Sequence, residues 1–340
     1  MQVSNTDAIG IAEKNGKVTF TEKARNLGNL FPEWRLGILV VISAFLIFMG
    51  SHTFFSPRNL ETVTLAIAIV AIAALGQLFA VIVGGIDLST GSVMGLAGLV
   101  TAMLMAPGLY GTVGGGIHMW IAIPIGLIVG TLIGVINGVL HVRFGITPFI
   151  VTLATLQVAR GITIGIPSAR TITGLPDEFV FIGNGHILGI PISVCLLLIL
   201  LIIVSLFLAL TPTGRDLYAI GGNRYAARLA GVNVNPLLVG AYAISGFFAA
   251  LSGILVTAKL GAAVPNAGTG YELTVIAAVV IGGASLSGGV GRPIGLLFGA
   301  IILGMINNAL VLLRIPTYWQ QVFIGGIIMT AAILDRVRRQ

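Results

Sequence analysis

The chain has 340 residues, of which 56% are hydrophobic and only 9% are charged, and its mean hydropathy is +1.06. A soluble protein of this length carries about a quarter charged residues, so the composition excludes that class and indicates an integral membrane protein. The formal charge of +7 comes from basic residues scattered through short segments. We therefore expect membrane lipid around the chain and no nucleic-acid partner.

The N-terminal segment 1–35 is polar and mixed in sign, unlike a cleavable signal, and is predicted to be a cytoplasmic tail. A transmembrane domain, 36–334, follows, and a basic C-terminal segment, 335–340, ends the chain. About 20 apolar residues cross a bilayer as a helix. The predicted spans are near 36–50, 60–83, 92–106, 119–140, 147–166, 191–210, 237–258, 272–284, 293–313 and 319–334. The fold class is thus all-α and polytopic, with about ten transmembrane helices, of which the third and eighth are short.

The basic residues predict the orientation, because an even number of spans places both termini on one side. With the N-terminus inside, thirteen of the 18 lysines and arginines fall in inner segments. The exceptions are Arg58, Arg170, Lys259 and Arg314 in outer segments and Arg160 within a span. This distribution follows the positive-inside rule and predicts cytoplasmic termini. The longest outer segment is 167–190.

The polar segment 211–236 separates two apolar runs and cannot itself cross lipid. Within it, Tyr225, Leu229 and Val232 recur at helical spacing, and Arg224 and Arg228 fall on another face. One interpretation is a solvated hairpin between two membrane helices. The other is a short amphipathic helix on the cytoplasmic side that docks a partner.

Small residues recur every fourth position in two of the predicted spans. They are Gly126, Gly130, Gly134 and Gly138 in one, and Ala241, Ser245, Ala249 and Gly253 in the other. In lipid, small residues at this spacing let helix backbones touch. We favour packing within one subunit over a seam between two subunits.

Residues 80–91 resemble residues 278–289, since each is an apolar helix ending in Gly-Gly, then a small polar loop, then another helix. On the predicted topology both loops lie on the cytoplasmic side, so this is no inverted repeat. It indicates broken or closely packed helices beside a pathway.

No catalytic or metal-binding constellation is found in the sequence. The four histidines are far apart, and neither a Gly-x-Ser-x-Gly elbow nor a G-x-x-x-x-G-K-[ST] phosphate loop occurs. We therefore expect no enzyme activity, no metal site and no ATPase site on this chain. Cys195 is the only cysteine, which excludes an internal disulfide.

Ionisable residues in or beside the apolar spans are few: Asp87, Arg160 and Glu272. Such residues are costly in lipid and are functional candidates by default. Asp87 and Glu272 each follow glycines and are expected at helix mouths that water reaches, where capping of the next helix is favoured over a pathway role. Asn137, Asn307 and Asn308 line a polar path or bond helix to helix, and the sequence leaves both open.

A proton- or sodium-driven carrier usually needs buried carboxylates to bind its coupling ion, and this chain has almost none. A carrier powered by a separate ATPase needs instead a cytoplasmic surface that the ATPase grips. Segment 211–236 meets that description.

Several ordered motifs resemble the membrane subunit of ribose-type, monosaccharide-transporting ABC importers. They are residues 84–92 (GGIDLSTGS), 214–231 (GRDLYAIGGNRYAARLAG), 265–272 (PNAGTGYE), 276–289 (IAAVVIGGASLSGG), 303–308 (LGMINN) and 319–321 (WQQ). The similarity runs from about Asn59 to the C-terminus. Thr274 departs from the family, which often has Asp or a small residue there.

The resemblance implies a vitamin B12-permease-like fold in the bacterial inner membrane, with two permease subunits, identical or not, forming the pathway. It also implies a cytoplasmic ATP-binding subunit, which carries ATP and Mg and docks on a coupling helix near 222–232, and a periplasmic sugar-binding protein. No cofactor is expected on this chain. The coupling residues would be Gly214, Arg215, Gly222, Asn223, Arg224, Ala227, Arg228 and Gly231. The pathway or gate residues would be Gly84, Gly85, Asp87, Ser89, Asn137, Glu272, Gly282, Gly283, Ser285, Ser287, Asn307 and Asn308.

The expected function is inward passage of a monosaccharide or cyclic polyol, such as a ribose-type sugar, galactoside, xylose or inositol, by alternating access. Related permeases serve nucleosides or branched-chain amino acids, so these solutes are alternatives. A stand-alone secondary carrier or channel is a further alternative.

Overall fold

The computed structural model describes residues 53–106 and 116–316 and, singly or in pairs, residues 43, 47, 319, 321, 322, 325, 326 and 329. Its helices are α3 (Pro57–Ile82), α4 (Thr90–Met105), α5 (Met119–Phe144), α6 (Pro148–Gly165), α7 (Asp177–Asn184), α8 (Ile192–Leu210), α9 (Pro212–Gly222), α10 (Arg224–Leu229), α11 (Val234–Leu260), α12 (Tyr271–Ile281) and α13 (Pro293–Leu312). The strands β1 (His186–Ile187) and β2 (Ile190–Pro191) form an antiparallel hairpin in which Ile187 pairs with Ile190.

Six of these helices are long and apolar enough to cross a membrane, namely α3, α5, α6, α8, α11 and α13. The shorter apolar helices are α4 and α12. These eight match the eight predicted spans between residues 60 and 313, and the helix ends differ from the prediction by at most four residues. The chain is therefore a helical, multi-pass membrane protein. The predicted spans 36–50 and 319–334 lie outside the continuously described ranges, so the total of ten stays a prediction.

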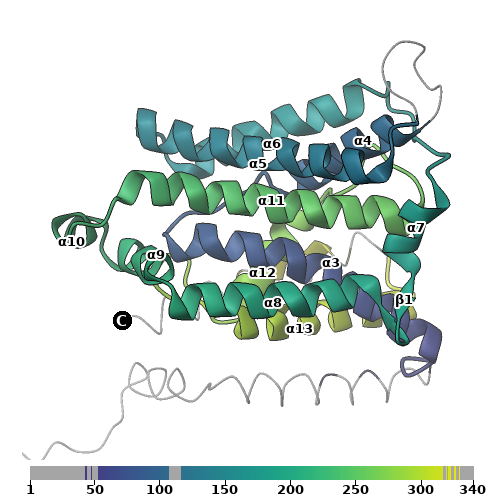
Figure 1. Cartoon of the computed structure of the whole chain (residues 1–340). Coiled ribbons are helices and arrows are strands. Elements are labelled where there is room, and N and C mark those ends of the chain that lie inside the picture. Colours follow the sequence, from purple (N-terminus) through teal and green to yellow (C-terminus); the bar gives the residue numbers. More distant parts are fainter. Residues whose placement is uncertain are drawn as a thin grey trace, which may run out of the picture.

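Helix α11 lies in the middle of the bundle, with α5 on one side and α3 on the other (Figure 1). The glycines of α5 face it directly. A Cβ added at Gly130 would lie 2.6 Å from the Gly246 carbonyl oxygen, and one at Gly138 would lie 2.6 Å from the Val239 Cα. The backbones of the two helices therefore touch, as small residues at this spacing permit.

The small residues of α11 pack in the same way on its other side. A Cβ added at Gly76 of α3 would lie 3.0 Å from the Ser245 Cα, and Gly253 lies against the Met94 backbone of α4. The prediction that both series of small residues pack within one subunit is confirmed.

Helices α4 and α12 are short because the loops before them enter the bundle. Ser245, which bonds to the loop before α4, lies eleven residues beyond the start of α11, about 16 Å along its axis. The loop after α11 turns back until Gly268 lies against the Gly91 backbone, so that a Cβ added at Gly268 would lie 3.3 Å from the Met94 Cβ. Both helices thus begin inside the bundle. Non-helical backbone at membrane depth is tolerated where protein buries it, and broken helices of this kind accompany solute pathways.

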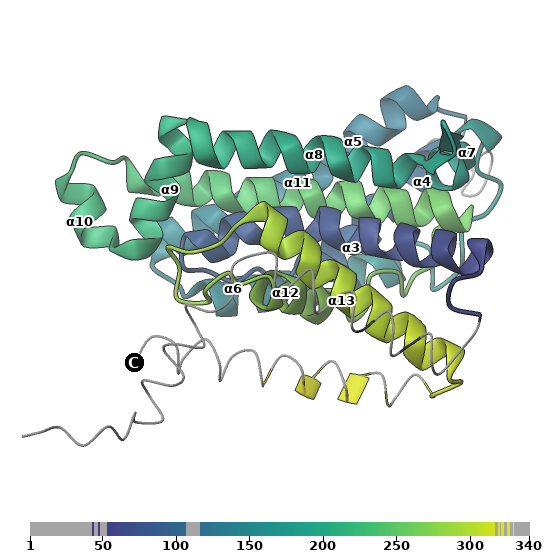
Figure 2. The same ribbon diagram turned by 90° about the horizontal axis from the view of Figure 1, so that it is seen from below.

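The two ends of the bundle differ. Helices α9 and α10 project from one end, called the α10 end, and α7 with β1 and β2 lies at the other, called the α7 end (Figure 1). Helix α13 crosses the bundle obliquely and packs on α12 and α3 (Figure 2).

Candidate functional site

Helices α9 and α10 form a hairpin with a cap at the start of each helix. Thr211 accepts a hydrogen bond from the Gly214 N–H at 3.0 Å, and Asn223 accepts one from the Ala226 N–H at 3.0 Å. Helix α10 ends before Gly231, whose φ of 86° is left-handed. The helix predicted near 222–232 therefore exists, with Asn223 as its cap.

The outer surface of α10 combines apolar and basic side chains. Tyr225 and Leu229 are 73% and 72% exposed, and Arg224 and Arg228 are exposed beside them. Only Ala227 turns inward among the residues of this helix. Exposed apolar side chains on a projecting helix are typical of interaction surfaces.

The end of α9 is joined to two loops at glycines. A Cβ added at Gly221 would collide with the Ile82 carbonyl oxygen and with the Gly289 N–H, and that N–H donates a hydrogen bond to the same carbonyl at 2.9 Å. A Cβ added at Gly288 would lie 2.9 Å from the Gly84 Cα. We call this contact of Gly84, Gly221, Gly288 and Gly289 the glycine junction.

The glycine junction brings together the two loops whose sequences resemble each other. Gly288 and Gly289 have φ values of 91° and 74°, which favour glycine. The second loop is folded tightly, since the Ser287 N–H bonds to the Ser285 Oγ at 3.3 Å, and Gly282 lies against the Gly295 backbone. The close helix packing predicted from the internal repeat is confirmed.

Tyr218 gives α9 a second connection to the same loop. Its hydroxyl donates a hydrogen bond to the Gly291 carbonyl at 2.7 Å. Burial raises the pKa of the Tyr218 hydroxyl, and the charge of Arg292 lowers it. A displacement of α9 would therefore act on the loop that leads into α13.

Arg224 connects α10 to the bundle interior. The Nδ1 of His141 lies 2.7 Å from the Ile146 carbonyl, which can only accept, so Nδ1 donates, and the Nε2 of the same ring faces Arg224. Arg224 Nη1 lies 3.5 Å from this Nε2. The His141 ring in turn meets the Tyr242 ring edge to face, with centroids 6.3 Å apart, and the Tyr242 hydroxyl lies against Gly85.

Asp87 lies at the centre of a buried polar cluster and is only 1% exposed. Its Oδ1 accepts hydrogen bonds from the Ser89 hydroxyl at 2.6 Å and the Ser89 N–H at 2.9 Å. Its Oδ2 accepts from the Ser245 hydroxyl at 2.7 Å. The carboxylate thus joins the start of α4 to the middle of α11.

Further polar side chains extend this cluster to α5, α6 and α3. Asn137 donates to the Ser89 hydroxyl at 3.0 Å and accepts from Thr155 at 2.6 Å. With its amide nitrogen toward Thr90, Gln77 accepts from the Asp87 N–H at 3.1 Å and donates to the Asp87 carbonyl at 3.0 Å. Five helices are tied together around one loop.

The position of Asp87 corrects one sequence-based expectation. A helix mouth reached by water was expected, but Asp87 is buried inside the bundle. Capping is only part of its role. The hydrogen bond to the Ser89 N–H is local, whereas the one from Ser245 joins two residues that are 158 positions apart in the sequence and so holds α11 to the loop before α4.

Glu272 lies between the first turns of α12 and α4. Its Oε1 accepts a hydrogen bond from the Gly270 N–H at 3.2 Å, which supports the expected capping role. Its buried Oε2 has no hydrogen-bond partner among the described residues and lies against Gly91. Arg160 is nearby and donates to the Ala267 carbonyl at 2.8 Å, which holds the entering loop in place.

The adjacent asparagines of α13 have different surroundings. Asn308 and Asn59 exchange two amide hydrogen bonds, of 3.0 and 2.8 Å, which join α13 to α3. The side-chain amide of Asn307 makes no hydrogen bond within the described part of the chain and borders a cavity. Asn308 thus bonds one helix to another and also borders this cavity, whereas the Asn307 side chain only borders it.

A family model described as branched-chain amino acid transport system / permease component matches residues 59–332. The chain belongs to this permease family. Searching the solved structures gave no match.

The permease also resembles individual sugar permeases. It is 40% identical to the ribose import permease protein RbsC of Haemophilus influenzae over 313 residues, 91% of this chain and 94% of the relative. It is 38% identical to the D-allose transport system permease protein AlsC of Escherichia coli, over 88% of this chain and 90% of the relative. It is 36% identical to the L-arabinose transport system permease protein AraH of Escherichia coli, over 93% and 94%.

The structure of the permease divides the pathway candidates into separate groups. Asp87, Ser89 and Asn137 share the buried cluster. The glycine junction and the loop beside it contain Gly84, Gly282, Gly283, Ser285 and Ser287. Gly85 lies against the Tyr242 hydroxyl. Glu272 lies at the start of α12, and Asn307 and Asn308 lie on α13, apart from both groups. No single site in the described residues holds all of them.

Some of the coupling candidates have packing roles. A Cβ at Gly214 would lie 2.6 Å from the Leu208 carbonyl, so this glycine sets the bend between α8 and α9. Arg215 Nη1 lies 3.5 Å from the Leu210 carbonyl at the same bend. Gly222 faces open space.

Sequence reasoning missed Gln77, Thr155 and Tyr242 and classed Ser245 only as a small packing residue. Polar residues in apolar spans were the available signal for Gln77 and Thr155. Nothing in the local sequence distinguishes Tyr242 from a core aromatic residue.

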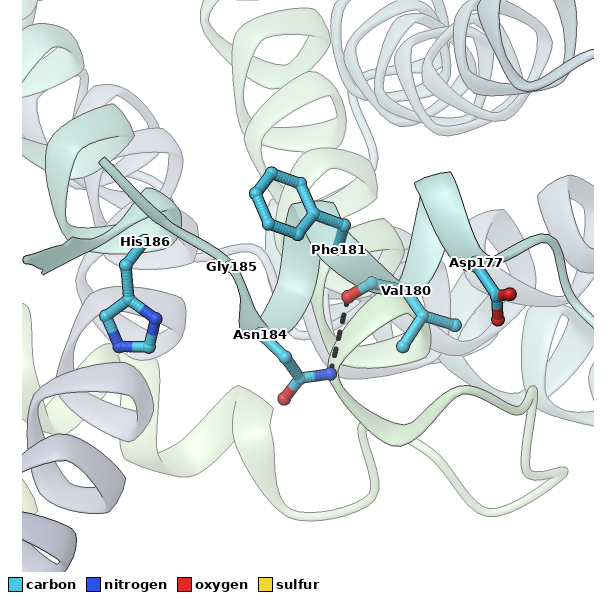
Figure 3. A pocket seen from close by; sticks show the side chains of 6 residues that line it. All are labelled: Asp177, Val180, Phe181, Asn184, Gly185 and His186. Carbon is cyan, nitrogen blue, oxygen red and sulfur yellow. Dashed lines mark hydrogen bonds between the residues drawn. The ribbon is translucent and has the colours of Figure 1, made fainter. Parts of the chain in front are cut away.

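The α7 end of the permease carries an open hollow lined by Asp177, Val180, Phe181, Asn184, Gly185 and His186 (Figure 3). Phe181 is 58% exposed there. His186 Nε2 lies 3.1 Å from Glu61 Oε1, which ties the hairpin to the start of α3.

Proposed function

We propose that the chain is the membrane-spanning subunit of an ATP-binding-cassette importer that passes a monosaccharide or cyclic polyol inward. The observation that carries this proposal is 36–40% identity to ribose, allose and arabinose permeases over about nine-tenths of the chain. The family description names branched-chain amino acids, so transport of an amino acid is the second candidate. The sugar permeases named above favour the first.

The proposed topology has ten spans in the bacterial inner membrane, a vitamin B12-permease-like fold and both termini in the cytoplasm, with 1–35 and 335–340 as its tails. The α10 end then faces the cytoplasm, as its arginines favour. A second permease subunit would complete the pathway, and a periplasmic sugar-binding protein would deliver the solute at the α7 end.

Energy would come from a cytoplasmic ATP-binding subunit that holds ATP and Mg and docks on α10. Acidic or backbone acceptor groups on the surface of this subunit would take hydrogen bonds from Arg224 and Arg228. The same surface would cover the exposed side chains of Tyr225 and Leu229. This chain would supply no cofactor and no ATPase site.

Closure of the ATPase pair would push the α9–α10 hairpin, and two connections would carry the movement into the bundle. The glycine junction and the Tyr218 hydrogen bond act on the loops before α4 and α13. The contact of Arg224 with His141 acts on α5 and, through Tyr242, on α11. Alternating access follows if ATP and the delivering protein prefer the same conformer.

Reconstitution of the permease in vesicles with its ATPase and binding protein tests this function. Uptake of labelled D-ribose, D-allose, L-arabinose and L-leucine is measured with and without ATP. ATP-dependent uptake of a sugar is expected. Uptake of leucine alone would favour the second candidate, and uphill uptake by the isolated chain without nucleotide would indicate a secondary carrier.

A further inference from the structure

A cavity of about 270 Å³ opens between α3, α12 and α13, and we call it the α3–α12–α13 groove. Its polar lining residues are Thr62, Tyr271, Thr274, Asn307 and Asn308, and aliphatic side chains of α3 and α13 form the rest. The volume is close to the lower end of the roughly 300–1,000 Å³ found for small-molecule sites. Apolar walls with a few polar groups are also typical of such sites.

The side chain of Asn307 indicates that the groove does not face acyl chains. Its amide makes no hydrogen bond within the described residues, although the amide of the neighbouring Asn308 donates one hydrogen bond to Asn59 and accepts one from it. An amide without a partner in hydrocarbon is costly, so a polar side chain in a membrane protein that is not paired with another protein group faces water-filled or solute-filled space. Asn307 therefore needs water or a polar solute beside it.

The other polar groups are arranged to accept hydrogen bonds. Thr62 donates its hydroxyl hydrogen to the Arg58 carbonyl at 2.9 Å, and Thr274 donates to the Gly270 carbonyl at 3.2 Å. Their oxygen lone pairs stay available, and the Asn307 amide can both donate and accept. Tyr271 adds an aromatic ring with a polar tip.

This combination matches a neutral cyclic polyol. Each sugar hydroxyl both donates and accepts, which suits threonine oxygens and an amide, and the C–H face of the ring suits Tyr271 and the aliphatic walls. Among the described residues that line the groove, none carries a charged side chain that would recognise the ammonium and carboxylate of an amino acid.

The place of the groove in the fold also fits a pathway. Tyr271 and Thr274 belong to the first turn of α12, a helix that begins inside the bundle. Solute sites in transporters are typically built at such interrupted helices.

We propose that the α3–α12–α13 groove binds the transported sugar through Asn307, Thr62, Thr274 and Tyr271. This rests on the proposed sugar-import function. The groove lies at the half of α3 that is nearer the α7 end, so it would take the sugar as the delivering protein releases it.

The first test measures maximal uptake of labelled D-ribose, D-allose and L-arabinose by the complete importer. Asn307→Ala and Thr62→Val are expected to lower uptake about tenfold while the ATPase stimulation by loaded binding protein is kept, since a hydrogen bond to the solute is lost. Thr64→Val is the control, because Thr64 lies two residues along α3, is exposed, and bonds only to the backbone of its own helix. Normal uptake by both groove variants overturns the inference. Wild-type protein that moves none of the three sugars counts instead against the proposed function.

The second test asks directly whether the groove is hydrated and occupied by sugar. In a Cys195→Ser background, Thr274→Cys is expected to react with a charged thiol reagent, and the transported sugar is expected to slow the reaction. Ile202→Cys on α8, where Ile202 is 59% exposed on an apolar helix, is the control that faces lipid. If Thr274→Cys reacts no faster than Ile202→Cys, the groove is filled by lipid or by protein and the inference is wrong. This result is independent of which solute the importer carries.

Discussion

The N–H of Gly289 donates a 2.9 Å hydrogen bond to the carbonyl of Ile82, the last residue of α3. Gly221, at the end of α9, lies against both of these groups. Because three chain segments meet through backbone atoms, no side chain is present at this contact to absorb a change. A displacement of α9 is therefore passed to two loops at once.

Gly221→Ala is expected to disturb this junction, because the new Cβ would collide with the Ile82 carbonyl and the Gly289 N–H. Overpacking of this kind costs about 1–3 kcal/mol. The measurement is the free energy of unfolding in detergent micelles, together with coupled uptake in vesicles. Gly240→Ala in α11 is the control, since nothing lies within 4 Å of its added Cβ and Gly240 is not among the coupling candidates. Equal effects of the two variants would contradict a specific junction at Gly221.

Ser245→Ala is expected to destabilise the protein more than Ser252→Ala. Both serines are buried on α11, and each donates one 2.7 Å hydrogen bond, but Ser245 bonds to the Asp87 carboxylate whereas Ser252 bonds to the Ile69 carbonyl. Hydrogen bonds to charged groups contribute about 1.5–3 kcal/mol and neutral ones about 1 kcal/mol.

Unfolding in mixed micelles measures both variants, and an Asp87→Asn background shows whether the difference depends on the carboxylate. A loss at Ser245 no larger than that at Ser252 would mean that Asp87 is neutral or bonded mainly to Ser89. If Asp87→Asn lowers only stability and leaves transport unchanged, Asp87 has a structural role alone.

The membrane spans were predictable because apolar length alone defines them. Pro57–Ile82 and Val234–Leu260 stand out in the sequence as long apolar runs with polar or Gly/Pro breaks at both ends. The spacing of Arg224 and Arg228 in the sequence also predicted that they share one face of a short helix, and in the structure both lie exposed on α10.

The contacts between helices were not predictable in the same way. In a span that is apolar all round, hydrophobic periodicity does not tell which face is buried. The sequence therefore gave no reason to pair Asp87 with Ser245 or Asn59 with Asn308, which are 158 and 249 residues apart. The depth at which α4 and α12 begin was hidden for the same reason, since a loop that enters the bundle reads as an ordinary polar break.

Gly134→Ala is expected to separate α5 from α11, because its Cβ would collide with the Tyr242 carbonyl and lie 2.9 Å from the Ala243 Cα. Both contacts are backbone atoms, which cannot move aside as a side chain can. The expected cost is about 1–3 kcal/mol, measured by thermal unfolding in detergent. Gly161→Ala in α6 is the control, since its added Cβ meets nothing within 4 Å, and it should be neutral or slightly stabilising. A neutral Gly134→Ala would show that the two helices are not in backbone contact.

Charge reversal on α10 tests the docking surface. Arg228→Glu, and the double variant with Arg224→Glu, are expected to abolish uptake and sugar-stimulated ATPase activity while membrane insertion stays normal. The reason is that a negatively charged α10 would repel the acidic groups proposed to receive it, and placing like charges together costs several kcal/mol at protein interfaces.

Arg228→Glu alone separates docking from the contact of Arg224 with His141. Arg170→Glu, which changes an exposed arginine outside the α9–α10 hairpin, is the control and should leave co-purification of the ATPase subunit intact. Co-purification of the ATPase subunit measures docking directly, and undiminished stimulation by the double variant would remove α10 as the coupling surface.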